Sequence, residues 1–326
     1  MLLGKHAVFP RAKHLGMVSI PPLCCFTSEE SHYSIKSAAA VLGIGADNCF
    51  NIPTDASGRM LPRALEEQII KSKEEGLYPF FVCATAGTTV YGAWDPIEEI
   101  SEICERHNLW LHVDAAWGGG ILLSPEYRHK LAGIERAKSV TWNPHKLMGS
   151  LLQCSACFVR QEGLLFQVNQ MSADYLFQQD KPYDVSYDTG DKAIQCGRHN
   201  DIFKLWLMWR SREWKAIVVK LIVLWIWPNT LLKELRQLKD LKWLWMKYVP
   251  KSIRSVDLRE KMSRLEKIAP KIKAQMMKRG TTMVGYQPDE HKKRPNFFRM
   301  VISNSNVQKV DLDFIIDEIV NLGYDL

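Results

Sequence analysis

Short apolar runs alternate with amphipathic stretches through the first 160 residues of the chain. Stretches with a helical repeat occupy 61–75 and 95–107, and runs of strand length occur at 79–84, 109–113, 139–142 and 155–160. Pro62 and Gly76 mark the start and end of the first helical stretch, while Asp95 and Pro96 are placed to cap and open the second. Because strands and helices alternate, the pattern predicts a parallel sheet with right-handed crossovers.

A different order of elements is expected in the last third of the chain. We predict two strands at 281–287 and 296–303, a final helix at 311–322, and before them a helix at 257–279 that Pro270 bends or breaks. Residues 213–247 hold five of the eleven tryptophans and have no clear helical period. This run is either a divergent buried helix or an error in the sequence, and we favour the error. The predicted organisation is a large α/β domain at 1–210, a divergent connecting segment at 211–250 and a small α+β domain at 251–326.

Two apolar strands end in groups that can carry chemistry. The run Ser139–Trp142 is followed by Pro144, which ends the strand and leaves His145 and Lys146 at its carboxyl end. The run at 109–113 is followed by Asp114 and then by small residues. Open α/β sheets bind their ligands beyond the carboxyl ends of the strands, so both motifs fall where a ligand is expected.

Each motif also has an ordinary structural interpretation. Most lysines lie in water, so a single His-Lys pair is usually a surface dipeptide. A carboxylate at the end of a buried strand needs a partner, which a helix N-terminus or an ion pair can supply. Together, however, a lysine for a Schiff base and an acid for a pyridinium nitrogen are the two protein groups that a pyridoxal phosphate (PLP) enzyme needs.

The chain resembles the PLP-dependent group II amino-acid decarboxylases, and within that family it most resembles glutamate decarboxylase. The resemblance runs in family order over most of residues 1–210 and 248–326. The stretches that carry it are Ala84–Ala93, Val113–Gly120, Thr141–Lys146, Tyr175–Gln178, Asp184–Arg198 and Asn296–Arg299. Any one of these stretches alone is unspecific, whereas the ordered set is highly specific.

The resemblance implies a cofactor site for PLP. Lys146 would bind PLP covalently, and Asp114 would keep its ring nitrogen protonated by charge pairing. His32 and Ala116 would lie on the two faces of the ring. The residues alone leave His32 open, because a histidine between an apolar strand and the Ala-rich helix expected at 34–42 is as often a capping or surface residue.

The resemblance also implies residues around the rest of the site. Thr89 would lie near the ring hydroxyl, and Asn143 and His145 near the phosphate. Tyr175, in a long polar and aromatic loop at 169–191, would return a proton to Cα after carbon dioxide leaves; its alternative is a packing role. Arg299 ends an apolar run, where a guanidinium needs an anion, either a substrate carboxylate or a structural ion-pair partner.

The chain departs from the family at its beginning. Family members continue considerably further at the N-terminus, with a segment that clasps the dimer, a Gly/Ser loop that binds phosphate and several substrate-pocket residues. Residues 1–326 contain no such stretches. Because the N-terminal segment of family members clasps the dimer, we expect a homodimer in the full-length form. We also expect that residues 1–326 alone do not turn over, since a cofactor without its phosphate cradle is held weakly.

Composition and charge argue against two further classes, nucleic-acid-binding proteins and membrane-spanning proteins. The 326 residues are 46% hydrophobic and 24% charged, as in an ordinary soluble protein with one large core and a smaller domain. No nucleic-acid-binding motif accompanies the net charge of +7, so we interpret the basic residues as a solvated face and expect no nucleic-acid partner. The apolar run at 216–227 is too short to span a membrane.

The cysteines favour a reducing compartment. Eight of them are scattered along the chain, and Cys154 and Cys157 form the one pair with redox-motif spacing. Positions i and i+3 of a strand point to opposite faces, so we expect buried structural thiols at this pair and no metal site. The first residues do not have the pattern of a signal peptide, and the predicted location is the cytoplasm.

The predicted fold is that of the fold-type I PLP enzymes, a large α/β domain with a mostly parallel sheet and a small C-terminal α+β domain. The predicted function is PLP-dependent decarboxylation of an acidic amino acid, L-glutamate to GABA and carbon dioxide. Cysteine sulfinate or aspartate is the alternative substrate. An alternative of another class is a decarboxylase-like fragment without catalytic activity that only binds a partner protomer.

Overall fold

The chain divides into two compact units, Met1–Trp214 and Lys215–Leu326. The computed structural model describes residues 1–173, 175–176, 178, 180–195, 197–212, 255–289, 294–304 and 306–324. The tryptophan-rich run at 213–247, for which we favour a sequence error, lies outside the described residues.

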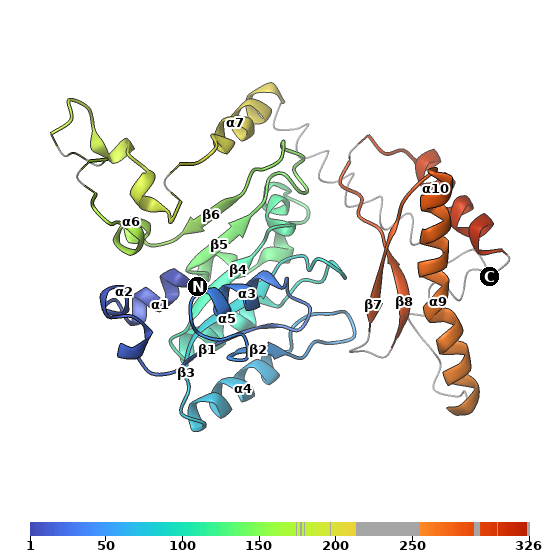
Figure 1. Cartoon of the computed structure of the whole chain (residues 1–326), viewed down its shortest axis with the longest axis horizontal. Coiled ribbons are helices and arrows are strands. Elements are labelled where there is room, and N and C mark those ends of the chain that lie inside the picture. The colour runs from blue at the N-terminus through green and yellow to red at the C-terminus, as the bar shows by residue number, and fades with distance from the viewer. Residues whose placement is uncertain are drawn as a thin grey trace. The chain divides into compact units, whose positions relative to one another are not determined.

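A six-stranded sheet forms the centre of the N-terminal unit (Figure 1). Its strands are β1 (Leu23–Ser28), β2 (Cys49–Ile52), β3 (Tyr78–Thr85), β4 (Trp110–Asp114), β5 (Ser139–Trp142) and β6 (Ala156–Val159). Their order across the sheet is β2-β1-β3-β4-β5-β6. The first five strands are parallel and β6 runs antiparallel to β5. The mostly parallel α/β sheet predicted from the alternating pattern is confirmed.

Helices join the first four parallel strands along the chain. In the N-terminal unit α3 (Ser34–Val41) links β1 to β2, α4 (Pro62–Glu74) links β2 to β3, and α5 (Ile97–Arg106) links β3 to β4. In α5 the buried residues Ile97, Ile100 and Ile103 recur every three residues, which places them on one side of the helix. The apolar side of α5 therefore faces the sheet, as the amphipathic pattern of the sequence predicted.

Asp95 does not cap α5 as the sequence predicted. Its carboxylate is 3% exposed and accepts the backbone N–H groups of Met60 and Thr85, each at 2.7 Å, while α5 has no side-chain cap. Asp95 therefore ties the segment before α4 to the end of β3. Burial raises the pKa of Asp95 to about 6, although the two N–H donors act in the opposite direction. The prediction was wrong because a carboxylate between a strand and a helix can reach back to the strand.

The core is most complete around two neighbouring inner strands of the sheet, β1 and β3. All six residues of β1 and seven of the eight in β3 are buried, as expected for parallel strands covered on both faces. Strand β6 at the edge has no buried residue. Cys154 before β6 is buried, but Cys157 within it is exposed, so the expectation that both thiols are buried was wrong for Cys157. An edge strand has a neighbouring strand on one side only, and less of the protein covers it.

The chain reverses its direction across the sheet between β1 and β3. From β1 it moves outward to β2 on one side, and from β3 it moves outward through β4 and β5 on the other. Open sheets of this kind bind their ligands beyond the carboxyl ends of the strands at such a reversal. The topology therefore places the expected ligand site beyond Ser28, Thr85 and Asp114.

The C-terminal unit consists of a hairpin and two helices. Its elements are α9 (Ser255–Arg279), β7 (Gly285–Asp289), β8 (Arg294–Arg299) and α10 (Lys309–Gly323), and the two strands are antiparallel. Pro270 was expected to bend or break the first helix, but it lies inside α9 without ending it. Ile272 and Met276, which follow the proline, pack with Ile319 of α10. Tertiary packing thus keeps this part of α9 helical despite the lost N–H bond.

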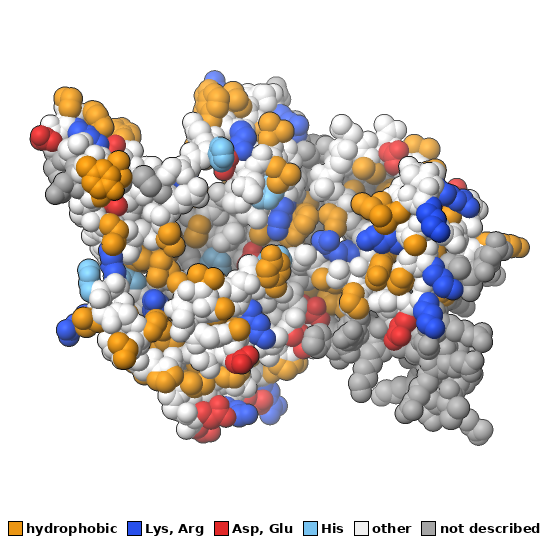
Figure 2. Space-filling view, in the orientation of Figure 1, with side chains coloured by type: hydrophobic (Ala, Val, Ile, Leu, Met, Phe, Trp, Pro, Cys, Tyr) orange, Lys and Arg blue, Asp and Glu red, His pale blue; other side chains and the backbone are white. Residues whose placement is uncertain are grey.

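Basic, acidic and apolar side chains are interspersed over the described surface. Figure 2 shows Lys and Arg side chains among hydrophobic and acidic ones on this face, without merging into one basic patch there. Such a mixture is typical of a solvated surface. None of the helices in the described ranges combines the length and apolar character needed to cross a bilayer.

Candidate active site

The carboxyl ends of β4 and β5 remain joined beyond the last pair of strand residues. Asp114, the last residue of β4, lies opposite Thr141 of β5. After it, the Ala115 N–H donates to the Thr141 carbonyl at 2.9 Å, and the Asn143 N–H donates to the Ala116 carbonyl at 3.3 Å. These backbone bonds keep the segment after Asp114 next to the segment that leads to the lysine.

Lys146 lies in the turn after β5. Its backbone N–H donates to the Asn143 carbonyl at 2.9 Å, and its Nζ atom lies 4.9 Å from the centre of the Trp117 ring. An ammonium group at this distance is attracted by the electrons of the ring face. Trp117 follows Asp114 by three residues, so the predicted lysine and the predicted acid belong to segments in direct contact.

Two glycines after β4 permit this close packing. A Cβ atom on Gly118 would contact the Trp94 ring and lie 2.5 Å from the Ala86 carbonyl oxygen, and one on Gly119 would lie 2.7 Å from the Trp142 ring. The Gly118 N–H donates to the same Ala86 carbonyl at 3.0 Å. The segment after β4 is therefore held against the end of β3 on one side and the end of β5 on the other.

The Asp114 carboxylate is half-buried and has a fixed direction. Its Oδ1 atom accepts the Ala116 N–H at 3.0 Å, which is the geometry of an Asx turn. One carboxylate oxygen is thus bound to the chain's own backbone. Ala116, which the sequence predicted on one face of the cofactor ring, is 8% exposed, and its small side chain lets another group approach closely.

His32 lies beyond the end of β1, beside the reversal of the sheet. Its Nδ1 atom accepts the Ser34 N–H at 3.3 Å and lies 2.8 Å from the Ser34 hydroxyl oxygen, so in the neutral ring the proton is on Nε2. His32 therefore binds the first residue of α3, although the N-cap residue of this helix is Tyr33. The Tyr33 ring also lies beside the imidazole, with the two ring centres 4.5 Å apart and their planes tilted by 41°.

The other predicted residues differ in their surroundings. Thr89 is half-buried in the turn that follows β3. The Nδ1 atom of His145 lies 2.6 Å from the Cys154 carbonyl oxygen and 3.1 Å from the Cys154 backbone nitrogen, so the imidazole is tied to the backbone just before β6. Tyr175 is 79% exposed in its loop, and Arg299 is the last residue of β8 in the C-terminal unit. The structure thus brings together Lys146, Asp114, Ala116 and Asn143, whereas Tyr175 and Arg299 belong to other segments.

Buried polar atoms without partners concentrate around this site. Among the described residues six such side-chain atoms occur, and five belong to carboxyl ends of strands or to the segments that follow them. The five are Thr27 Oγ1, Thr85 Oγ1, Trp117 Nε1, Asn143 Oδ1 and Ser150 Oγ. Each unpaired buried group costs about 1–3 kcal/mol, so a polar ligand is expected there. PLP carries a hydroxyl, a ring nitrogen and a phosphate, and these residues fit it.

Sequence reasoning assigned no role to Trp117 or Thr85. For Trp117 a signal existed, namely a large aromatic residue between small ones directly after a strand-ending acid. For Thr85 none existed, because its unpaired hydroxyl depends on which neighbouring side chains reach it. In the described part of the chain, no three His, Cys, Asp or Glu side chains gather in a way that could bind a metal ion.

Known proteins resemble this chain over its whole length. The model of the pyridoxal-dependent decarboxylase conserved domain matches residues 1–222. Two crystal structures of mouse CSAD, one of them in apo form, are 42% and 43% identical with TM-scores of 0.90 and 0.91, and each match covers 100% of this chain and 69% of the mouse chain. Tryptophan decarboxylase of Catharanthus roseus, in complex with L-tryptophan, matches 100% of this chain and 67% of its own at 24% identity and a TM-score of 0.80, which shows a shared fold.

Proposed function

The chain belongs to the pyridoxal-dependent decarboxylase family, whose members are PLP-dependent carboxy-lyases, and we propose that its substrate is an acidic amino acid, cysteine sulfinate before glutamate. The observation that supports decarboxylase chemistry is the contact between the Lys146 turn and the segment that follows Asp114. The similarity to mouse CSAD, a cysteine sulfinic acid decarboxylase, supports the first substrate. Glutamate is the second candidate because the motif resemblance in the sequence favours it.

Lys146 is proposed to hold the cofactor at its aldehyde group, and Asp114 at its ring nitrogen. When bound, PLP supplies an aldehyde that bonds to amines and a cationic ring that accepts the electron pair of the broken Cα–carboxylate bond. Lys146 would provide the amine that holds the aldehyde. Asp114 would keep the ring nitrogen protonated, because a nearby anion favours the charged form of a base.

Tyr175 is proposed to deliver the proton that replaces carbon dioxide at Cα. A phenol is protonated at neutral pH and can therefore act as a general acid there. Tyr175 is 79% exposed, so its delivery of a proton requires the loop to bring the hydroxyl to the substrate. A loop that closes in this way also excludes water while the reaction proceeds.

Arg299 is proposed to bind the second acidic group of the substrate. Its guanidinium is half-buried at the end of β8. The planar arrangement of its N–H donors suits the two oxygens of a carboxylate or a sulfinate. Both proposed substrates carry such a group at the end of a short side chain, whereas tryptophan carries a neutral ring.

The substrate test uses the protein extended at its N-terminus to the length of its relatives, supplied with PLP. Cysteine sulfinate, aspartate, glutamate and tryptophan are compared at equal concentration, and carbon dioxide and the product amines are both measured. We expect kcat/KM to be highest for cysteine sulfinate and amine formation to be absent with tryptophan. Decarboxylation of tryptophan alone, or of none of the three acids, would contradict the proposal.

A second arm of the same test concerns Arg299. Arg299→Ala should lower kcat/KM for the acidic substrates by roughly a hundredfold, since losing a charged partner of a buried anion costs about 2–5 kcal/mol. Arg299→Lys keeps the charge but not the paired N–H donors, so its loss should be intermediate. PLP binding, followed by its absorbance, should not change. Equal loss of PLP binding and turnover would assign Arg299 a structural ion pair instead.

A further inference from the structure

The loop that carries Tyr175 is closed at its base by a buried carboxylate. The loop leaves α6 (Leu164–Asn169) and returns at a 3-10 turn, η6 (Gly190–Lys192). Asp191, which is 6% exposed, accepts the Met171 N–H on Oδ1 at 3.2 Å and the Ser172 N–H on Oδ2 at 3.3 Å. Both carboxylate oxygens at the end of the loop therefore bind the beginning of the loop.

Asn169 reinforces the same closure. Its side-chain nitrogen donates to the Lys192 carbonyl at 3.2 Å and to the Leu165 carbonyl at 3.0 Å. One amide group thus connects the last turn of α6 with the residue that follows Asp191. Together, the two side chains join both ends of a segment that is about twenty residues long.

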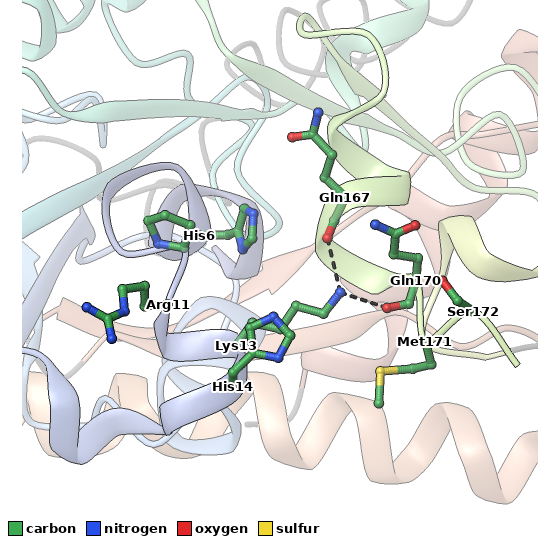
Figure 3. Close-up of a pocket in the computed structure, with 9 residues that line it drawn as sticks. His6, Arg11, Lys13, His14, Gln167, Gln170, Met171 and Ser172 are labelled. Atoms are coloured by element: carbon green, nitrogen blue, oxygen red, sulfur yellow. Dashed lines mark hydrogen bonds between the residues drawn. The ribbon is translucent and has the colours of Figure 1, made fainter.

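Lys13 holds this base from a distant part of the chain. It lies in α2 (Ala12–Leu15), and its Nζ donates to the Gln167 carbonyl at 3.1 Å and to the Gln170 carbonyl at 2.7 Å. Figure 3 shows the side chain reaching from α2 to these two carbonyls across the pocket that it lines. The last carbonyls of a helix have no partner within the helix, and a cation is favourable there.

The backbone at the base adopts a conformation that needs support. Ser172 has a φ of +50°, in the left-handed region that residues with a Cβ atom rarely adopt. The N–H of this residue is one of the two groups bound by Asp191. Conformations of this kind persist where the surrounding contacts hold them, and they cluster at functional loops.

We propose that Lys13 and Asp191 are positioning residues that fix the base of the loop and thereby set how often Tyr175 reaches the substrate. This inference rests on the proposed role of Tyr175. With Ser172 held, three residues of extended chain let Tyr175 move at most about 10 Å from its anchor. If the anchor moved back to Asn169, six residues would let it move about 20 Å. The accessible volume would grow roughly eightfold, and the local concentration of the phenol would fall by the same factor.

The first test measures the closure without any reaction. Hydrogen exchange is followed in the peptide that contains Met171 and Ser172. Asp191→Asn and Lys13→Met should speed exchange there by about tenfold, the effect of losing one net hydrogen bond, while amides of β3 stay unchanged. Lys13→Arg keeps a cation and should behave as the unsubstituted protein. Lys71→Met, on the exposed face of α4, is the matched control.

The second test measures the positioning of Tyr175 in the N-terminally extended holoenzyme. The quantity is the fraction of turnovers that end in amine rather than in conversion of PLP to pyridoxamine phosphate, which follows when the proton goes to the wrong carbon. Tyr175→Phe should lower this fraction. Asp191→Asn, which releases Ser172, should lower the rate of correct protonation by roughly eightfold. Lys13→Met should lower it less, because Lys13 binds Gln167 and Gln170. Neither change should add to the effect of Tyr175→Phe.

The outcomes separate the two proposals. Unchanged exchange in both Lys13→Met and Asp191→Asn would overturn the closure itself. Faster exchange with full additivity in the Tyr175→Phe background would show that the closure is structural and does not act through Tyr175. If Tyr175→Phe leaves the product fraction unchanged, the proposed proton donor is wrong, and the exchange experiment still decides whether Lys13 and Asp191 hold the loop.

Discussion

The Nζ atom of Lys146 lies 4.9 Å from the centre of the Trp117 ring, and a second pair of the same kind occurs at the opposite end of the same two strands. There, Lys138 precedes β5 and its Nζ lies 5.8 Å from the centre of the Trp110 ring at the start of β4. Each of the two lysines thus lies over a tryptophan ring, but they do so at opposite ends of the two strands. Only Lys146 is at the carboxyl end of the strands, where ligands bind in such sheets.

This relationship gives a prediction for cofactor attachment with an internal control. Borohydride reduction of the protein loaded with PLP should leave the label on the peptide that contains Lys146. Lys146→Ala should abolish the label, whereas Lys138→Ala, which removes the matching amine at the other strand end, should not. A label that maps to Lys138 or to another lysine would contradict the assignment.

A second prediction concerns the charge of Asp114. Asp114→Asn keeps an oxygen that can accept the Ala116 N–H, so the turn should survive. The neutral amide no longer favours a protonated ring nitrogen, and the ring becomes a poorer acceptor of electrons. We expect decarboxylation to fall by a hundredfold or more, on the order of 3 kcal/mol in the barrier, with PLP still attached. Spectra of the bound cofactor check attachment, and equal loss of attachment would contradict the proposed role.

The sequence allowed prediction of features that depend on neighbours in the chain. The strands around Phe81, Val113 and Val140 follow from apolar runs, and Pro144 ends its strand in the structure as it does in the pattern. For the same reason it was predictable that Asp114 and Lys146 lie at the carboxyl ends of strands. These features require only that each run be buried and that strands alternate with helices.

The failures have a common cause in contacts between distant residues. Asp95 binds Met60, which lies 35 positions away, instead of capping the helix that follows it. Cys157 is exposed because its strand is at the edge of the sheet, which no local pattern reveals. The closure of the loop by Lys13 joins residues more than 150 positions apart. Such contacts are set by tertiary structure, and local propensity does not encode them.

A third prediction tests the packing that joins β3, β4 and β5. In Gly118→Ala the new Cβ would lie 2.5 Å from the Ala86 carbonyl oxygen, a backbone atom that cannot move aside without moving the segment after β3. We expect a loss of about 1–3 kcal/mol in the free energy of unfolding, as for overpacked sites. Gly197→Ala is the control, because its Cβ would meet nothing within 4 Å. Urea unfolding measures both, and equal effects would contradict the packing argument.

The last prediction concerns pH and the buried carboxylate of Asp95. Its pKa is about 6 in the folded protein, above its ordinary value of 3.8, because burial disfavours the charged form. Between these two values the folded state binds more protons than the unfolded state, so the contribution of Asp95 to the free energy of unfolding falls as pH rises. A difference of roughly two units corresponds to at most about 3 kcal/mol.

His112 acts in the opposite direction over an overlapping range. Burial lowers its pKa from 6.5 to about 3, so the folded state binds fewer protons and acid destabilises it. The pH dependence of the unsubstituted protein contains the contributions of both Asp95 and His112. Comparison with Asp95→Asn isolates the contribution of Asp95. Urea unfolding of the two proteins from pH 4 to pH 7 should give a stability difference, unsubstituted minus variant, that falls up to about pH 6 and then levels off. His112→Gln should instead raise the free energy of unfolding relative to the unsubstituted protein, and this increase should be largest at the acid end of the interval. Parallel stability curves for Asp95→Asn and the unsubstituted protein would show that Asp95 does not titrate in this range.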